Sequence, residues 1–552
     1  MGRERKRSWT RLGTALVVGL CVVGAVGGTS ASGDPPPPSR TTLRAVFASF
    51  PDYMDPQLSY TGEGWTAMRD VYVPLLTFRH AEGKAGTEVV PGLAQSLPMI
   101  TDGGRTYTLF LRPGLRYSDG TPVRASDFEY TVERMVKLYS GGLYFYTATI
   151  AGGERFEATG RGGISGIVSD NASGKIVIHL VEPTSYFPAL LALPFAALVP
   201  RGTPNRDLSF DPPPATGPYE IVSSDPQGWD YARNPAWGAG NAAALPDLPG
   251  GSVDRIDVDV VRNPEAEVRR VIAGKADWMQ NPPPPRLAAN LRHRFGGTRL
   301  RSDRAPSTYY FWMNTKRPPF DDVRIRRAAN FAVSPRALRR IYGGQLSPTH
   351  QILPPDLPGF ERFNLYPYDM RKARRLAAAA HPRDRRITVW TDTESPNTEA
   401  GIYFAGQLRK IGFRVHLKIV SADSYFNVIG SRRTPNLDAG WSNWFMDYPH
   451  PDDFLRPLLY GGSILPFFNG NFAKIAVPGL DAKIAALSRK PLGPATERAY
   501  ASLDRSYMKL APWVPYGTRI LTTFVSRAVD FDKVLFNPVF GAELTSFQFE
   551  DG

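Results

Sequence analysis

The chain has 552 residues, 42% of them hydrophobic, which is too long for one hydrophobic core and predicts two or three domains. Its formal net charge of +14 could suggest nucleic-acid binding, but the basic residues are dispersed and no RNA- or DNA-binding motif is present. We therefore expect no nucleic-acid partner. The single cysteine, Cys21, excludes a disulfide scaffold.

The N-terminus has the order of a secretory signal. Basic residues in Arg3–Arg11 precede an apolar run, Leu12–Val26, which is followed by small residues. Thr29 and Ala31 suit the −3 and −1 positions of a cleavage site. We therefore expect residues 1–31 to be a signal peptide and the protein to act outside the cytoplasmic membrane, in the periplasm or on the outer face of the membrane or cell wall.

Two alternatives for this segment stay open. Leu12–Ala31 could remain as an anchor, because a span needs about 20 apolar residues, although its glycines count against this. Cys21 could carry a lipid, but Leu20 stands where a lipid-attachment motif has a small residue. Cleavage after Ala31 would leave a mature chain without cysteine, and hence without disulfides or a thiolate nucleophile.

The first elements after the signal are extended. Consecutive prolines in Asp34–Arg40 favour polyproline II, so residues 32–41 are predicted to be a stiff linker. Thr42–Ala48 is predicted to be a strand.

A strand, turn and helix are predicted over residues 101–138. Apolar residues alternate from Tyr107 to Leu111, which is the period of a half-buried strand. Asp119-Gly120 is a turn dipeptide. Ser126 with Glu129 has the spacing of a capping box, so a helix is expected to begin there.

Strand and helix patterns continue to alternate, which argues for α/β sheets. Glu265–Ala273 is a predicted helix with Gly274 placed to end it, and Tyr309–Trp312 is a continuous apolar run typical of a buried strand. The other predicted helices are 186–198, 321–333, 373–380, 399–411 and 497–509, and the other predicted strands are 256–260 and 414–420.

Several short motifs occur in a fixed order along the chain. The motifs are Leu43–Pro56 with VYVPLLTF (71–78), PGLA (91–94), the 101–138 unit, TGPY (216–219) with Arg233-Asn234-Pro235 and Trp237, NTKRPPFDDVRIRR (314–327) and WFMDYPHPDDF (444–454). Together they resemble the solute-binding proteins of peptide and nickel ABC importers (family 5), and the likeness runs from about Thr42 to Phe549.

The resemblance implies an α/β fold of the periplasmic-binding-protein-like type II, in which two lobes joined by a hinge are accompanied by an extra small domain. The chain is expected to cross between the lobes near Arg301–Ser307 and near Arg519–Val529. The implied parts are lobe I (42–75, 201–305 and 525–552), small domain II (76–200) and lobe III (306–524).

No catalytic or metal-binding motif stands out. The sequence contains neither G-x-S-x-G nor H-E-x-x-H, and its seven histidines lack metal-ligand spacing. Ser442 lies between tryptophans and not on a nucleophile elbow. A carboxylate pair could still serve a secreted hydrolase, but nothing selects one among 52 acidic residues. We expect no enzyme activity, no metal and no cofactor.

One aromatic stretch has the composition of a binding site. Trp441, Trp444, Phe445 and Tyr448 surround Asp447, and small-molecule sites commonly combine aromatic walls with one orienting charge. From the residues alone, the alternative is a core strand and tight turn in which Asp447 caps backbone amides and the tryptophans only pack.

The resemblance favours the binding interpretation. It implies that Asp447 pairs with a ligand's amino terminus, that Trp444 lines a side-chain pocket and that the backbone of Phe445 meets the ligand. It also implies that backbone at Tyr60, Thr61 and Gly62 faces the ligand from the other lobe. No motif position identifies a residue for the ligand's carboxylate.

The expected function is therefore that of an extracytoplasmic solute-binding protein. It would capture a small ligand as a monomer, with peptide as the preferred ligand class, and deliver it to a membrane permease with its ATPases. Nickel chelates, opines and oligosaccharides are alternative ligands, and a surface receptor or chaperone-like role without transport is the alternative function.

Overall fold

The computed structural model describes residues 41–467 and 469–550, so the predicted signal segment and Cys21 lie outside the described residues. Within these ranges the principal feature is a mixed sheet of twelve strands. Its strands, in spatial order, are β16 (Arg414–Val420), β15 (Arg386–Asp392), β17 (Ala439–Phe445), β13 (Ser307–Met313), β18 (Trp513–Val525), β11 (Trp278–Met279), β1 (Thr42–Phe47), β10 (Arg255–Val260), β9 (Gly228–Arg233) and β8 (Tyr219–Asp225), while β12 (Leu300–Arg304) and β14 (Leu346–Ser347) also pair with β18.

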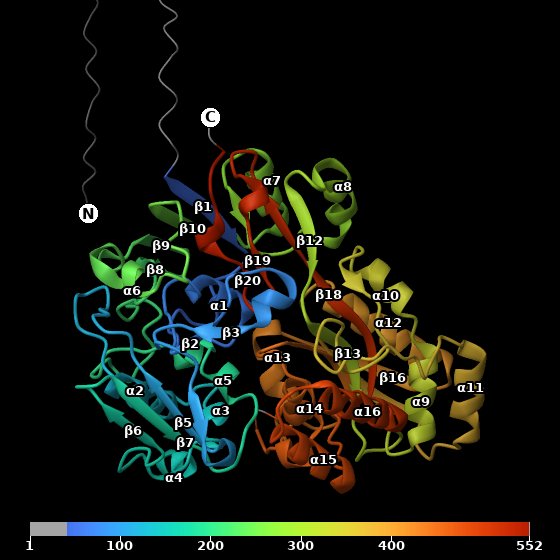
Figure 1. Cartoon of the computed structure of the whole chain (residues 1–552). Coiled ribbons are helices and arrows are strands. Elements are labelled where there is room, and N and C mark those ends of the chain that lie inside the picture. The colour runs from blue at the N-terminus through green and yellow to red at the C-terminus, as the bar shows by residue number, and fades with distance from the viewer. Residues whose placement is uncertain (1–40, 468, 551–552) are drawn as a thin grey trace, which may run out of the picture. The chain divides into compact units, whose positions relative to one another are not determined.

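Strand β18 connects the two halves of this sheet (Figure 1). Its first part pairs with β13, where Tyr309 lies opposite Gly517. From Ile520 onward it pairs with β12, and at Phe524 and Val525 also with β11. The change of partner occurs at Thr518–Ile520, next to the predicted crossing at Arg519–Val529.

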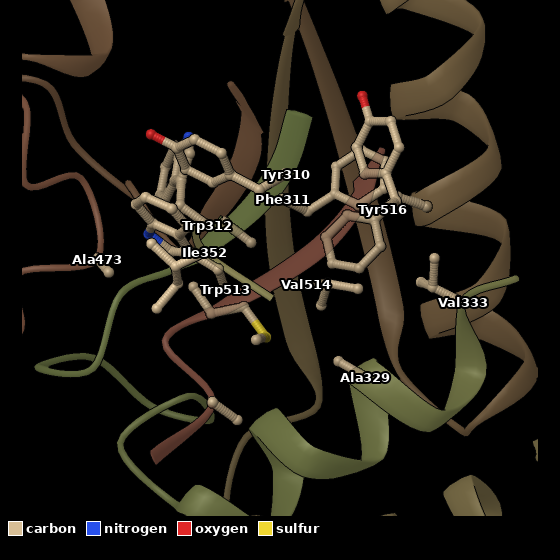
Figure 2. Packing of buried hydrophobic residues seen from close by; sticks show 14 of the residues in the cluster. Tyr310, Phe311, Trp312, Ala329, Val333, Ile352, Ala473, Trp513, Val514 and Tyr516 are labelled. Carbon is tan, nitrogen blue, oxygen red and sulfur yellow. The ribbon is translucent and has the colours of Figure 1, made fainter. Parts of the chain in front are cut away.

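The β13 half is held by an aromatic core. All seven residues of β13 are buried, as the continuous apolar run predicts. Tyr310 stacks on Trp513 at 3.6 Å between ring centroids, and Phe311 stacks on Phe404 at 4.2 Å. Figure 2 shows Tyr310 with Trp312 to one side of this core and Phe311 with Tyr516 to the other. The helices of this half are α9 (Val323–Ala332), α10 (Pro335–Ile341), α11 (Met370–Ala379), α12 (Asn397–Lys410), α13 (Ala422–Ile429), α14 (Asp452–Leu459), α15 (Pro478–Ser488) and α16 (Pro494–Leu510).

The β1 half pairs β1 in parallel with β10 and β11. Helix α7 (Pro264–Ile272) begins where the Asn263 side chain accepts hydrogen bonds from two backbone amides, and Gly274 follows it with φ of +66°. The predicted helix at 265–273 is therefore confirmed. The other helices of this region are α1 (Gly62–Met68), α6 (Ala242–Ala244) and α8 (Pro285–Phe295).

A separate sheet of four strands lies between α1 and β8 in sequence. It contains β4 (Met99–Thr101), β5 (Thr106–Phe110), β7 (Lys175–His179) and β6 (Ile167–Asp170), and α2 (Ser126–Lys137) packs near β6. Shorter elements are β2 (Leu76–Phe78), β3 (Val89–Pro91), α3 (Tyr144–Thr147), α4 (Gly153–Thr159), α5 (Phe187–Leu190), β19 (Phe536–Asn537) and β20 (Gly541–Ala542).

Two local predictions here are wrong. Helix α2 starts at Ser126 as expected, but no capping box forms: the residue before it makes no side-chain cap, and Asp127 instead accepts a hydrogen bond from the Arg124 amide at 2.8 Å. The helix predicted over 186–198 is only α5 and a short 3-10 turn at Pro194–Ala196, because proline at 194 has no amide to continue the helix.

A buried ion pair fixes the turn after β1. Arg134 of α2 donates to Asp55 through both terminal nitrogens, one of them at 2.7 Å, and both side chains are fully buried. The same guanidinium also bonds to Gln57 and to two backbone carbonyls. The segment that leads to Tyr60 is therefore held to α2.

Candidate ligand-binding site

Tyr60 and Asp447 meet through their side chains. The Tyr60 hydroxyl donates to Oδ2 of Asp447 at 2.7 Å. Tyr60 lies just before α1, and Asp447 lies two residues after β17. The structure therefore brings together two of the residues that the sequence analysis placed at the ligand.

Asp52 holds Tyr60 in place. Its Oδ2 accepts the Tyr60 amide at 2.6 Å, and its Oδ1 accepts the hydroxyl of Thr61 at 2.8 Å. Thr61 also caps α1 by accepting the Gly64 amide. The Tyr60 ring stacks on Trp65 with centroids 5.9 Å apart. These contacts fix the Tyr60 ring and therefore the position of its hydroxyl.

Asp447 is positioned by the turn that follows β17. Met446 donates its amide to the Pro306 carbonyl at 2.9 Å, and Asp447 donates its own amide to Oδ2 of Asp453 at 3.0 Å. Among the described residues no backbone amide donates to the Asp447 carboxylate. The capping role that the alternative gave to Asp447 therefore belongs to Asp453.

The Asp447 carboxylate is buried without a cation. The residue is 7% exposed, and burial raises the pKa of Asp447 to about 7, an effect that the Tyr60 hydrogen bond partly opposes. In the described part of the chain no Lys, Arg or His lies within ion-pair distance of it. The nearby Arg456 pairs with Asp452 at 2.6 Å. Burial and the charge of Asp447 together raise the pKa of Asp453.

Aromatic side chains surround this acid. The hydroxyl of Tyr144 lies 3.4 Å from that of Tyr60. Tyr144 is 41% exposed, and burial by the surrounding protein together with the charge of Asp447 raises the pKa of its hydroxyl well above the usual value. Tyr186 stacks on Tyr448 at 5.0 Å. The site thus offers apolar walls beside one buried carboxylate.

The remaining predicted residues are less close to the carboxylate. Phe445 is 39% exposed and contacts Tyr309 edge-on at 6.0 Å. Trp444 is half-buried, and its indole lowers the pKa of Asp453. Trp441 lies in the core, where its Nε1 donates to the Tyr516 hydroxyl at 2.8 Å. Gly62 is exposed at the start of α1.

Sequence reasoning missed three residues of the site. Tyr144 belongs to an aromatic run, Leu143–Tyr146, that could have drawn attention, and Asp453 lies inside the motif at 444–454. Tyr186 carries no local signal, because only the tertiary fold places it on Tyr448.

Residues 41–467 and 469–550 lack two further kinds of feature. No group of three or more His, Cys, Asp or Glu residues is placed there to hold a metal ion. None of the helices in these ranges has the length and apolar character that crossing a membrane requires. A hollow of about 830 Å³ beside α2 and α4, lined by residues such as Tyr139 and Glu157, contains none of the site residues.

Known proteins resemble the chain over most of its length. It is 25% identical to heme-binding protein A of Haemophilus influenzae over 511 residues, covering 86% of this chain and 87% of that protein. It is 24% identical to the glutathione-binding protein GsiB of Escherichia coli K12 over 444 residues, covering 78% and 80%.

Solved structures agree with the predicted fold. The clavulanic acid biosynthesis oligopeptide binding protein 2 has a TM-score of 0.83 at 26% identity, covering 93% of this chain and 96% of its own. The periplasmic binding protein DppA from Helicobacter pylori, solved with the peptide STSA, has a TM-score of 0.75 at 20% identity, covering 93% and 98%. The type II α/β fold is thereby confirmed.

The family model described as "Bacterial extracellular solute-binding proteins, family 5 Middle" matches residues 88–465. The predicted family is therefore correct: the chain belongs to the family 5 extracellular solute-binding proteins, which serve ABC importers as their ligand-capturing component.

Proposed function

We propose that this protein binds short peptides outside the cytoplasmic membrane and delivers them to an ABC permease, and that Asp447 anchors the ligand's amino terminus. The observation that carries the proposal is the buried Asp447 carboxylate, which has no cation within ion-pair distance among the described residues. Binding without chemistry is the whole of the proposed role.

A peptide ammonium group suits this acid. An ammonium has three N–H donors, and hydrogen bonds between ionised groups are about twice as strong as neutral ones. Asp447 accepts from Tyr60 through Oδ2, which leaves acceptor capacity on both oxygens. The ammonium would offset the desolvation of the carboxylate, which costs several kcal/mol for an isolated buried charge.

The relatives support a peptide ligand. One solved relative is named for oligopeptide binding, and the Escherichia coli relative is named for glutathione, itself a small peptide. The Haemophilus influenzae relative is named for heme, which is the second candidate ligand by name. The buried carboxylate of Asp447, with tyrosine side chains beside it, favours the peptide.

The proposal assigns residues 42–75, 201–305 and 525–552 to one lobe, residues 306–524 to the other, and residues 76–200 to the small domain. Tyr60 and Asp447 then belong to opposite lobes. Ligand binding would draw the lobes together by hinge motion and exclude water from the anchor. Export through cleavage after Ala31 is part of the same proposal, and protein recovered from outside the cytoplasm should start near Ser32.

Mass spectrometry of the ligands released when the purified protein is denatured tests the proposal. Peptides with free amino termini are the expected result, and the Asp447→Asn protein should release far fewer of them. Release of heme, nickel chelates, opines or oligosaccharides in place of peptides would contradict the peptide assignment.

A further inference from the structure

The fold gathers exposed basic side chains at the outer side of the β13 half. Helix α11 lies beside α9 there, and β16 is the edge strand of the large sheet (Figure 1). Residues 369–386, which run through α11 to the start of β15, and residues 409–414, which join α12 to β16, contain ten lysines and arginines against two carboxylates. All ten of these cations are exposed. We call them the basic patch.

Hydrogen bonds to backbone carbonyls join the two segments of the basic patch. Arg374 of α11 donates through Nε to the Lys410 carbonyl at 3.0 Å, and Arg385 donates to the Gly412 carbonyl at 3.2 Å. The Arg414 amide donates in turn to the Arg385 carbonyl at 2.7 Å. The two segments therefore lie side by side, and their cations form one continuous charged surface.

Both carboxylates in these segments already have partners. Asp369 caps α11 by accepting the Lys372 amide at 2.9 Å, and Asp384 pairs with Arg386 at 3.1 Å. In the ranges that the structure describes, Arg386 is the one member of the basic patch with a carboxylate oxygen within 4.0 Å. The protein's own acids therefore leave most of this positive charge unbalanced.

Like charges are also adjacent within the basic patch. Arg371 and Arg375 are one turn apart on α11, a spacing at which like charges destabilise a helix. Arg386 lies directly opposite Arg414 in the pairing of β15 with β16, where like charges are again unfavourable. A bound anionic surface would remove this repulsion.

We propose that the basic patch binds anionic lipid headgroups and so holds this side of the protein against the outer surface of the cytoplasmic membrane. The inference goes beyond the proposed function and does not depend on which ligand the protein carries. Clustered lysine and arginine side chains bind anionic lipid surfaces, and a guanidinium binds phosphate oxygens through two parallel N–H bonds. Carbonyl contacts hold Arg374 and Arg385 in place for such binding.

The surrounding side chains favour lipid over nucleic acid. Single-stranded nucleic acid is bound by successive aromatic side chains on which the bases stack. Residues 369–386 and 409–414 contain no Trp or Tyr, and their one phenylalanine, Phe413, is buried. Tyr368, at the border of the basic patch, is 52% exposed, and tyrosine suits a membrane interface because its ring is apolar and its hydroxyl is polar.

Vesicle sedimentation of the secreted protein, without detergent, tests the proposal. The vesicles contain phosphatidylglycerol and phosphatidylcholine in equal parts, or phosphatidylcholine alone. Salt is raised from about 0.1 M to about 1 M, which shortens the Debye length from about 10 Å to about 3 Å. The test variant is Arg371→Gln with Arg375→Gln, because neither side chain has a hydrogen bond or ion pair in the described ranges. The matched control is Arg269→Gln with Arg270→Gln on α7, which removes the same charge from exposed side chains that are ion-paired.

Wild type should sediment with the anionic vesicles at low salt, leave them at high salt, and stay in solution with phosphatidylcholine. Each lysine or arginine near an anionic surface contributes about fivefold in affinity, so the test variant should bind at least about tenfold more weakly. The control should bind as wild type does, and Arg371→Lys with Arg375→Lys should retain binding. Thermal melts show whether each variant is folded, and the two glutamine substitutions made singly replace the pair if it is not.

Three results would overturn the proposal: no binding of wild type to anionic vesicles, equal weakening in the control, or equal binding to phosphatidylcholine. Duplex DNA that binds wild type more tightly than the vesicles do, and is lost in the test variant, would assign the basic patch to nucleic acid instead. Peptide binding should be unchanged in the test variant, because the basic patch shares no residue with the Asp447 site. A wild-type protein that binds vesicles but no peptide would contradict the proposed function alone.

Discussion

The Tyr60 hydroxyl donates a hydrogen bond to the Asp447 carboxylate over 2.7 Å, although 387 residues separate the two in sequence. The contact joins the segment before α1 to the turn after β17. The neighbouring side chains are aromatic, and a tyrosine hydroxyl supplies no positive charge to balance the buried carboxylate. A ligand that brings an ammonium group completes this arrangement.

Tyr60→Phe should weaken peptide binding and move its pH dependence. The substitution removes the hydroxyl that lowers the pKa of Asp447 and keeps the ring that stacks on Trp65. The loss of one hydrogen bond to a charged group costs about 1.5–3 kcal/mol. Calorimetry at several pH values should show a weaker affinity. The loss of affinity on the acid side should also have its midpoint at a higher pH than in wild type. An unchanged midpoint would mean that the hydroxyl does not reach the carboxylate in solution.

Peptide affinity should depend on pH through Asp447. Burial raises its pKa to about 7 in the free protein, so below pH 7 a proton competes with the ammonium group. Affinity should fall by up to tenfold per pH unit on that side. Above about pH 8 it should fall again, because a peptide's amino group has a pKa of about 7.7–8.0. Titrations from pH 4 to 9 measure peptide affinity as a function of pH. In Asp447→Asn the affinity should not fall on the acid side.

Breaking the buried pair of Asp55 and Arg134 should strongly destabilise the fold. Both side chains are fully buried, so Arg134→Met leaves an uncompensated carboxylate, which costs about 3–5 kcal/mol. The matched control is Arg206→Met, because Arg206 and its partner Asp211 are exposed and such pairs contribute about 0–1 kcal/mol. Urea unfolding of both variants measures the difference. Equal midpoints would show that the buried pair is not a structural anchor.

Glu267→Met should stabilise the protein at alkaline pH. Glu267 is fully buried in α7, neither of its oxygens has a hydrogen-bond partner in the described residues, and burial raises its pKa to about 8. A raised pKa in the folded state means that stability is lost as pH rises from about 4.5 to about 8.

Removing this carboxyl group should therefore raise the unfolding midpoint more at pH 9 than at pH 5. Methionine fills the space with a flexible apolar chain. Urea titrations at the two pH values give the comparison. A stabilisation that is the same at both would show that Glu267 is not neutral in the fold.

Elements with strong local signals could be predicted from sequence. The strand at 414–420 matches β16, and α7 begins and ends within one residue of the predicted helix, because Asn263 and Gly274 mark its ends. The capping box at Ser126 failed because a neighbouring acid, Asp127, accepts the exposed amide. The spacing of residues in the sequence does not show which side chain accepts the hydrogen bond of a free backbone amide.

The site was harder to predict because its residues come from distant segments. Resemblance to the family selected Tyr60 and Asp447, but only the fold shows that the tyrosine's side chain, and not its backbone alone, reaches the acid. The position of Trp441 in the core depends on Tyr516, which lies in another strand.

The most direct test of the peptide anchor is calorimetry of Asp447→Asn with matched ligands. A tripeptide retained by wild type is compared with its N-acetylated form, and the same pair is then titrated into the variant. Wild type should strongly prefer the free amino terminus, and Asp447→Asn should lose about 2–5 kcal/mol of binding free energy for it while binding the acetylated form as wild type does. If the variant binds both peptides as wild type does, Asp447 does not anchor the ligand.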